Sequence, residues 1–111
     1  MPESTPVLDT LADMTAVSIE RSMLSEREHM LSRIAALAAI DAPVASYLMN
    51  AGVAADVGIT LEDVQGILIA VAPIVGTSRV VAAAGNITRA LGFAIAVAEA
   101  ELEAQLEADD D

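Results

Sequence analysis

Apolar residues recur along the chain at the three- and four-residue spacing of α-helices, and almost no segment keeps the two-residue alternation of a strand. Alanine, which has the highest intrinsic helix propensity, is abundant throughout. Start and stop signals divide this pattern into five helices, which we expect over residues 7–22, 26–40, 42–57, 61–72 and 78–104. The sequence therefore predicts an all-α, single-domain bundle of about five helices.

Two of the expected helix starts carry a capping box, in which a Ser or Thr hydroxyl and a carboxylate three residues later bond reciprocally to the backbone. Ser25 with Glu28 opens the second helix, and Thr60 with Asp63 opens the fourth. Thr5 is the expected N-cap of the first helix, because the proline after it suits a first helical turn. These residues predict where three of the helices begin.

Four residues are expected to mark the other boundaries. Asp41 is the expected N-cap of the third helix, with a proline in the first turn that follows. Gly58 stands after the third helix in the position of a left-handed C-terminal cap. Pro73 and Gly76 are expected to end the fourth helix, since proline removes a backbone donor and disrupts a helix interior.

The chain is more apolar than a monomer of its length can readily bury. Hydrophobic residues make up 55% of its 111 positions. A domain of this size buries on folding only about two thirds of the surface that its unfolded chain exposes. Residues 64–76 and 80–98 approach the length of a membrane span, but Gln, Gly and Pro interrupt the first and Asn, Thr and Arg the second. We therefore expect a homo-oligomer and no membrane association. The acidic, polar start lacks the basic region of a signal peptide, so we expect a cytoplasmic protein.

Two glycines, Gly85 and Gly92, lie seven residues apart inside the last expected helix. Each costs about 1 kcal/mol relative to alanine in a helix interior. We interpret them as places where another helix packs closely, within the chain or between subunits.

Charge excludes some classes of protein and leaves one alternative open. Seventeen acids against five arginines and no lysine give a net charge of -12, without the basic stripe that nucleic-acid binding needs. Residues 99–111 hold seven of the acids and no base. We expect this acidic tail to be a solvated helix end that frays; the alternative is a docking tail for a basic partner or a cation.

Few side chains are suited to chemistry. The chain has no cysteine and a single histidine, so we expect no metal site, no cofactor and no thiol-dependent peroxidase activity. His29, with Glu28 beside it and Arg33 one turn on, is a weak candidate for proton transfer or anion binding. Arg89, in an apolar helix, must reach solvent, pair with an acid, including across a subunit interface, or bind an anionic ligand.

Three segments match a known pattern. They are Ser-Glu-Arg-Glu-His-Met-Leu-Ser-Arg-Ile-Ala-Ala-Leu-Ala-Ala at 25–39, Ala-Asp-Val-Gly-Ile-Thr-Leu-Glu-Asp-Val at 55–64 and Ile-Ala-Val-Ala-Pro-Ile-Val-Gly at 69–76. Residues 25–86 thereby resemble the carboxymuconolactone decarboxylase-like family, which includes the alkylhydroperoxidase D-like proteins. The resemblance implies an all-helical fold that assembles as trimers or hexamers. It divides the chain into an N-terminal helix (1–24), a carboxymuconolactone decarboxylase-like core (25–98) and an acidic C-terminal tail (99–111).

The chemistry of that family does not carry over. At the positions of the two cysteines of the thiol-dependent members, this chain has Pro43 and Ser46. At the position of the histidine, which decarboxylase-type members keep, it has Asn50. The carboxylate on the preceding helix falls at Leu31, with Glu28 about one turn earlier. Ser46 and Asn50 can still hydrogen-bond a ligand, but neither transfers protons near neutral pH as histidine does.

Three functions follow as hypotheses. The first is a family member without redox or acid–base residues that serves as a structural or small-ligand-binding oligomer, with Ser46, Asn50 and Pro43 at the ligand. The second is a lyase acting on a small lactone or carboxylate through Glu28 and other relocated residues, with His29, Arg33 and Arg89 as the remaining candidates. The third is an interaction module that docks through its acidic tail.

Overall fold

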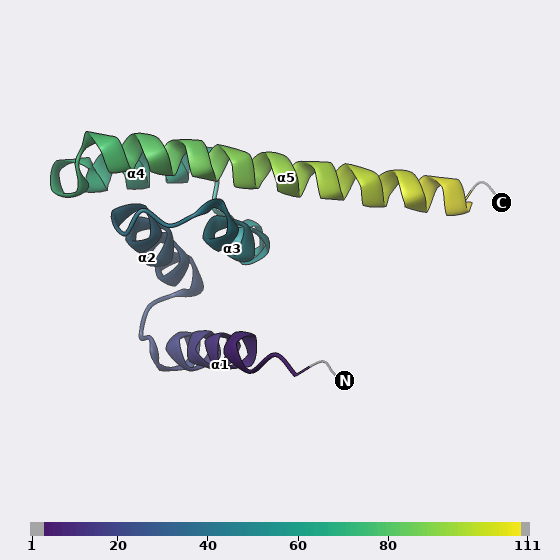
Figure 1. The fold of residues 1–111 in the computed structure, drawn as a ribbon, viewed down its shortest axis with the longest axis horizontal. Coiled ribbons are helices and arrows are strands. Elements are labelled where there is room, and N and C mark those ends of the chain that lie inside the picture. Colours follow the sequence, from purple (N-terminus) through teal and green to yellow (C-terminus); the bar gives the residue numbers. More distant parts are fainter. Residues whose placement is uncertain (1–3, 110–111) are drawn as a thin grey trace.

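A computed structural model describes residues 4–109 and contains five α-helices in that range. They are α1 (Pro6–Arg21), α2 (Glu26–Ala39), α3 (Val44–Asp56), α4 (Leu61–Val75) and α5 (Thr77–Asp109). No strand occurs among the described residues, so the all-α prediction is confirmed. Helices α2 to α4 pack together with the first half of α5, whereas α1 lies to one side and the second half of α5 extends beyond the bundle (Figure 1).

Both predicted capping boxes are present. The Ser25 hydroxyl accepts from the Glu28 N–H at 3.1 Å, and the Glu28 carboxylate accepts from the Ser25 N–H at 2.9 Å. Thr60 and Asp63 repeat this arrangement at the start of α4. Gly58, at φ 79°, follows the last residues of α3 in the left-handed conformation expected of it. The local signals at these helix ends are therefore confirmed.

The prediction that Asp41 caps the start of α3 is wrong. Asp41 adopts the left-handed conformation, with φ 57°, and the residue at the N-cap of α3 is Pro43, which makes no side-chain cap. The N–H of Ala42 donates to the carbonyl of Leu37 at 3.0 Å, closing the end of α2. Since aspartate tolerates the left-handed region better than most residues, Asp41 terminates α2 and does not initiate α3.

Three other expected helix ends are corrected. Thr5 makes no side-chain cap; its hydroxyl donates to the Asp9 carboxylate at 3.1 Å instead. Helix α4 runs through Pro73 and ends at Gly76, whose φ of 95° and N–H bond to the Ala72 carbonyl close it. Helix α5 continues to Asp109, five residues beyond the expected end, since alanine and glutamate are both strong helix formers.

The core consists of two clusters of buried side chains. The first is made mostly of alanines and brings α5 close to the α2–α3 region; it contains Ala38, Ala42, Tyr47, Ala83 and Ala90. The second joins α2 to α4 and contains Met30, Ile34 and Ile67. Because small side chains dominate the first cluster, the helices of the bundle approach one another closely there.

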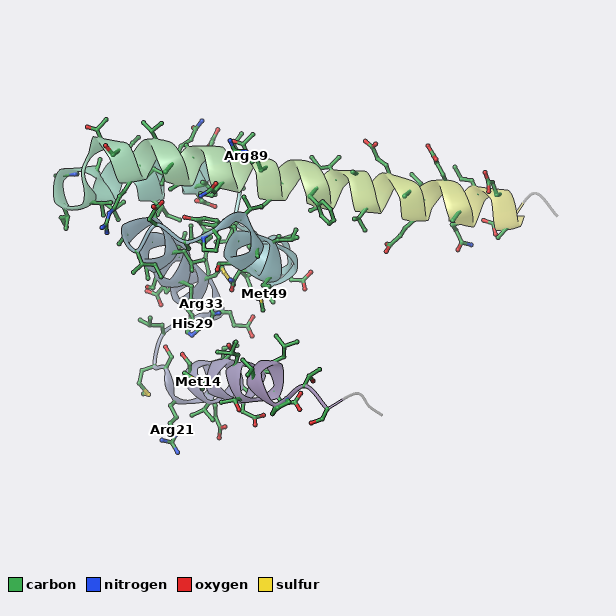
Figure 2. The ribbon with its side chains drawn as sticks, viewed as in Figure 1. Met14, Arg21, His29, Arg33, Met49 and Arg89 are labelled. Carbon is green, nitrogen blue, oxygen red and sulfur yellow. The ribbon has the colours of Figure 1, made fainter. Side chains whose placement is uncertain are left out.

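Helix α1 stands almost free of the bundle. None of its residues is buried, and among the described residues one side-chain hydrogen bond joins it to the bundle, between the Ser18 hydroxyl and the His29 Nε2 at 3.4 Å. Figure 2 shows Met14 on α1 and His29 on α2 on facing sides of the space between these helices. Met14 and Val7 are 62% and 71% exposed, so α1 presents much of its apolar surface to solvent.

Helix α5 has two properties that bear on assembly. By length and apolar composition it is the one helix among the described residues that meets the requirements of a membrane span, and little of that stretch is buried in the bundle. A Cβ on Gly92 would meet nothing within 4 Å, and one on Gly85 would meet only the Arg89 guanidinium at 3.8 Å. The close packing expected at these glycines is thus not found within the described chain, and packing between subunits stays a prediction.

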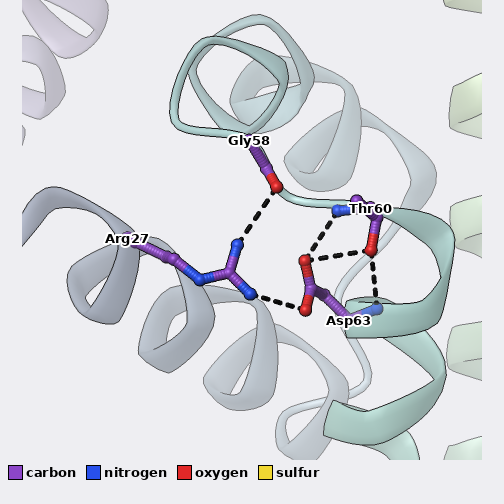
Figure 3. A network of polar contacts seen from close by, with 4 residues as sticks. All are labelled: Arg27, Gly58, Thr60 and Asp63. Atoms are coloured by element: carbon purple, nitrogen blue, oxygen red, sulfur yellow. Dashed lines mark hydrogen bonds and ion pairs between the residues drawn. The ribbon is translucent and has the colours of Figure 1, made fainter.

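A polar network ties the start of α2 to the start of α4 (Figure 3). Arg27 donates from Nη2 to the Asp63 carboxylate at 2.6 Å and from Nη1 to the Gly58 carbonyl at 3.1 Å. The hydrogen bond from Arg27 and the one from the Thr60 backbone lower the pKa of Asp63 from 3.8 to about 2. The hydrogen bond to Asp63 in turn raises the pKa of the Arg27 guanidinium.

We expect this network to make the protein sensitive to acid. The lowered pKa of Asp63 means that its contribution to stability is complete above pH 4 and is lost as the pH falls toward 2. In Asp63→Asn, the fall in melting temperature between these pH values should therefore be smaller than in the wild type. Thermal unfolding followed by circular dichroism at both pH values measures the difference; equal falls in the two proteins would contradict it.

Candidate functional site

A hollow of about 170 Å³ lies among α2, α3, α4 and α5. Most of its wall is apolar, contributed by alanines, mainly of α3, and by larger aliphatic residues of α2, α4, α5 and the α3–α4 connection. The residues that line it are Ile34, Tyr47, Asn50, Ala51, Ala54, Ala55, Ile59, Thr60, Leu61, Val64, Ile87, Ala90 and Leu91. Tyr47, Asn50 and Thr60 are the only polar side chains among them.

Asn50 is fixed in the wall by two hydrogen bonds. Its Oδ1 accepts from the Nε of Arg33 on α2 at 3.1 Å, and its Nδ2 donates to the Ser46 carbonyl one turn earlier at 2.7 Å. Both bonds are partly buried. An amide has two N–H groups and two lone pairs on its oxygen, so one donor and one acceptor of Asn50 remain for another partner.

Tyr47 lies one turn before Asn50 on α3 and is only 6% exposed. Its hydroxyl is buried and has no hydrogen-bond partner in the described part of the chain. Burial, and secondarily the charge of Asp41, raise the pKa of this hydroxyl, so it is neutral at physiological pH. A buried polar group without a partner costs free energy, and this hydroxyl is the one such side-chain group found among the described residues.

Sequence reasoning did not single out Tyr47. The signal that would have found it is its spacing, since a residue three positions before Asn50 shares a helix face with it. It is also the only tyrosine of the chain.

Of the four positions that the family resemblance singled out, Pro43, Ser46, Asn50 and Leu31, one lines the hollow. Asn50 does so directly. Ser46 is half-buried and contributes its backbone carbonyl to Asn50, while Pro43 is exposed at the N-cap of α3. A ligand in the hollow would therefore meet the amide of Asn50 before Ser46 or Pro43.

The four candidate catalytic side chains do not gather at one place. The carboxylate of Glu28 is engaged in its capping box, and its hydrogen bond from the Ser25 backbone lowers its pKa. His29 contacts Ser18 of α1, and Arg33 bonds to Asn50. Arg89 lies on α5, on the other side of the bundle from His29 and Arg33 (Figure 2). Its Nη1 donates to the Asn86 Oδ1 at 3.1 Å.

No group of three or more histidine and acidic side chains with the geometry of a metal site occurs over residues 4–109. The polar groups at the hollow are an amide, a phenol and the Thr60 hydroxyl, and the last already donates to the Asp63 carboxylate at 3.0 Å. Such groups bind neutral or weakly polar ligands by hydrogen bonds.

Comparison with known proteins gives no relative. The chain matches no protein-family model, no curated protein and no solved structure.

Proposed function

We propose that the protein binds a small, largely apolar molecule with one hydrogen-bonding group in the hollow among α2 to α5. The observation that carries this proposal is the buried Tyr47 hydroxyl without a partner, in the same wall as the half-used amide of Asn50. Apolar walls with a few fixed polar groups are typical of small-molecule sites.

The volume limits the size of the ligand. A dry cavity of about 150 Å³ accommodates benzene in an engineered protein, so the hollow of about 170 Å³ suits a molecule of one ring. Tyr47 and Asn50 each offer a donor, which a carbonyl, ester or hydroxyl oxygen of the ligand would accept. A small cyclic ester or alcohol therefore fits this site.

The resemblance to the carboxymuconolactone decarboxylase-like family supports a role without redox chemistry. With Pro43, Ser46 and Asn50 at the family's reactive positions, the site can hold a ligand and has neither a thiol nor a proton-transferring imidazole. We also propose, from the apolar composition and the exposed apolar faces of α1 and α5, that the protein acts as a homo-oligomer.

Ligand binding is tested with cyclohexanol and δ-valerolactone as probes, followed by NMR on the protein labelled with nitrogen-15. We expect saturable shifts of the Asn50 side-chain amide, with dissociation constants on the order of millimolar for molecules this small. Ala51→Leu, which fills the hollow, should abolish them. Ala45→Leu, at an exposed position of the same helix, is the matched control and should bind as the wild type does. No shift in the wild type with either probe would refute the proposal.

The role of the hydroxyl is tested separately. Tyr47→Phe keeps the ring and removes the group without a partner, so the free protein should be no less stable than the wild type. If the hydroxyl bonds to the ligand, both probes should bind roughly tenfold more weakly, as expected for one lost hydrogen bond. Unchanged affinity would mean that the ligand does not bond to the Tyr47 hydroxyl.

A further inference from the structure

One face of α5 is mostly apolar and exposed between Val81 and Leu102. Its residues follow one another at alternating spacings of three and four, the repeat of a coiled-coil seam. They are Val81, Ala84, Thr88, Leu91, Ile95, Ala98 and Leu102, and all seven are exposed. The buried residues of α5, Ala83 and Ala90, lie on a different face, so this seam face is not the one that packs in the bundle.

The charges of α5 are divided between its two halves. The first half carries both of its cations, Arg79 and Arg89, and no acid. The second half carries only acids, and over the described residues these are Glu99, Glu101, Glu103, Glu107 and Asp109. Two such helices side by side in parallel would place acid against acid, whereas an antiparallel pair places each acidic half against the basic half of the other.

We propose that the seam face of α5 binds the same face of a second copy of the chain, with the two helices antiparallel and related by a two-fold axis near Gly92. At 1.5 Å per residue the 33-residue helix is about 50 Å long. Its second half finds no cover within the described chain, and pairing supplies that cover (Figure 1). The inference builds on the proposed homo-oligomer and is independent of ligand binding.

The seam sequence sets one register. With the axis between the two copies of residue 93, Leu91 packs on Ile95 of the second copy, and Thr88 packs on its Ala98. Farther out, Ala84 meets the larger Leu102 of the second copy. The central layers thus pair two large side chains, and the layers beyond them each place an alanine opposite a medium or large side chain.

This register also gives the two glycines a role. Gly85 and Gly92 each directly follow a seam residue and so occupy the same position of the seven-residue repeat, beside the seam. In the antiparallel pair Gly92 faces Gly92 of the second copy at the axis. Gly85 faces Glu99 of the second copy. The Arg89 guanidinium already lies across Gly85, with Nη1 at 3.8 Å from where a Cβ would stand. The Arg89 guanidinium is therefore placed to form an ion pair with Glu99 of the second copy.

A consequence is an even number of chains. Two-fold pairing gives a dimer or a larger assembly that contains the same dimer, such as a hexamer, and it excludes an isolated trimer. Leu91 belongs both to the seam face and to the wall of the hollow, so pairing also encloses one side of the candidate ligand site.

The face is tested with two double variants of the full chain, compared by size exclusion with light scattering. Ile95→Glu with Leu102→Glu puts carboxylates in the seam and should reduce the dimer to the 11.4 kDa chain. Phe93→Glu with Val97→Glu adds the same charge to another exposed face of α5 and should leave the dimer intact. Far-ultraviolet circular dichroism confirms that both variants remain helical. An intact dimer in the first variant, or a monomer in the second, would overturn the proposal while the homo-oligomer itself could stand.

The charge pairing is tested by exchange. Arg89→Glu should weaken pairing roughly tenfold, because it turns two attractions into two repulsions. Adding Glu99→Arg to that variant should restore the wild-type dissociation constant. If the double variant dimerises as weakly as Arg89→Glu alone, Arg89 and Glu99 do not form an ion pair between the two copies.

The orientation is tested by disulfide formation, since the chain has no cysteine of its own. A mixture of Thr88→Cys and Ala98→Cys chains should form a mixed disulfide on mild oxidation, and neither variant alone should form one. Self-linked Ala98→Cys chains would indicate parallel helices and refute the antiparallel pair. Flotation with phosphatidylcholine vesicles should leave the protein in solution, whereas recovery with the vesicles would assign α5 to a membrane instead.

Discussion

Ile34→Ala is expected to lower the free energy of unfolding by about 2–5 kcal/mol. Ile34 is 6% exposed and packs with Met30 and Ile67 in the cluster that joins α2 to α4. Removing three carbons there loses the transfer free energy of the side chain and leaves a cavity, since the helices close over it only in part. A domain of this size has a total stability of about 5–15 kcal/mol, so the variant should be close to unfolding at 37 °C.

The matched control is Ile40→Ala, which removes the same atoms at the end of the same helix where the side chain is 69% exposed. Its effect should stay within about 0.5 kcal/mol. Urea unfolding followed by circular dichroism gives both values. Similar losses in the two variants would mean that the α2–α4 cluster is not packed as described.

Ala83→Leu is the second substitution with a large expected effect. Ala83 is 2% exposed and lies among Ala38, Ala42 and Ala90, where small side chains let α5 approach the bundle closely. Three additional carbons must push these helices apart, which costs about 1–3 kcal/mol or more. Since Tyr47 belongs to the same cluster, its near-ultraviolet circular dichroism should change as well.

Ala100→Leu is its control, because it adds the same side chain to an exposed position of the same helix. This variant should keep the wild-type melting temperature within a few degrees, since surface substitutions rarely exceed about 0.5 kcal/mol. If Ala83→Leu is tolerated equally well, α5 does not pack through its alanines.

The sequence predicted best what depends on neighbouring residues. The capping boxes of Ser25 and Thr60 were found because their partners lie three residues away, and Gly58 because a left-handed residue after a helix favours glycine. Asp41 was misplaced for the same reason, since aspartate suits both an N-cap and a left-handed terminus. The choice between them depends on how α2 ends, which local pattern does not determine.

The candidate site depends on distant residues and was only partly predictable. Arg33 and Asn50 were singled out for separate reasons, and only the packing of α2 on α3 joins them in one hydrogen bond. The apolar wall was missed because four helices contribute to it. Helix α4 extends two residues past Pro73, although proline lacks the N–H of a helical hydrogen bond, and the local pattern did not predict this extension.

The buried Tyr47 provides an optical signal that reports on the bundle core. It is the only tyrosine, and the chain has no tryptophan, so near-ultraviolet absorption comes chiefly from one ring in the bundle core. Because burial raises the pKa of its hydroxyl, the folded chain binds this proton more tightly than the unfolded chain, and stability falls as the pH rises above about 10. The absorption of tyrosinate in an alkaline titration therefore follows the opening of the core. This absorption does not report on motions of α1 or of the second half of α5, because neither segment contains a tyrosine.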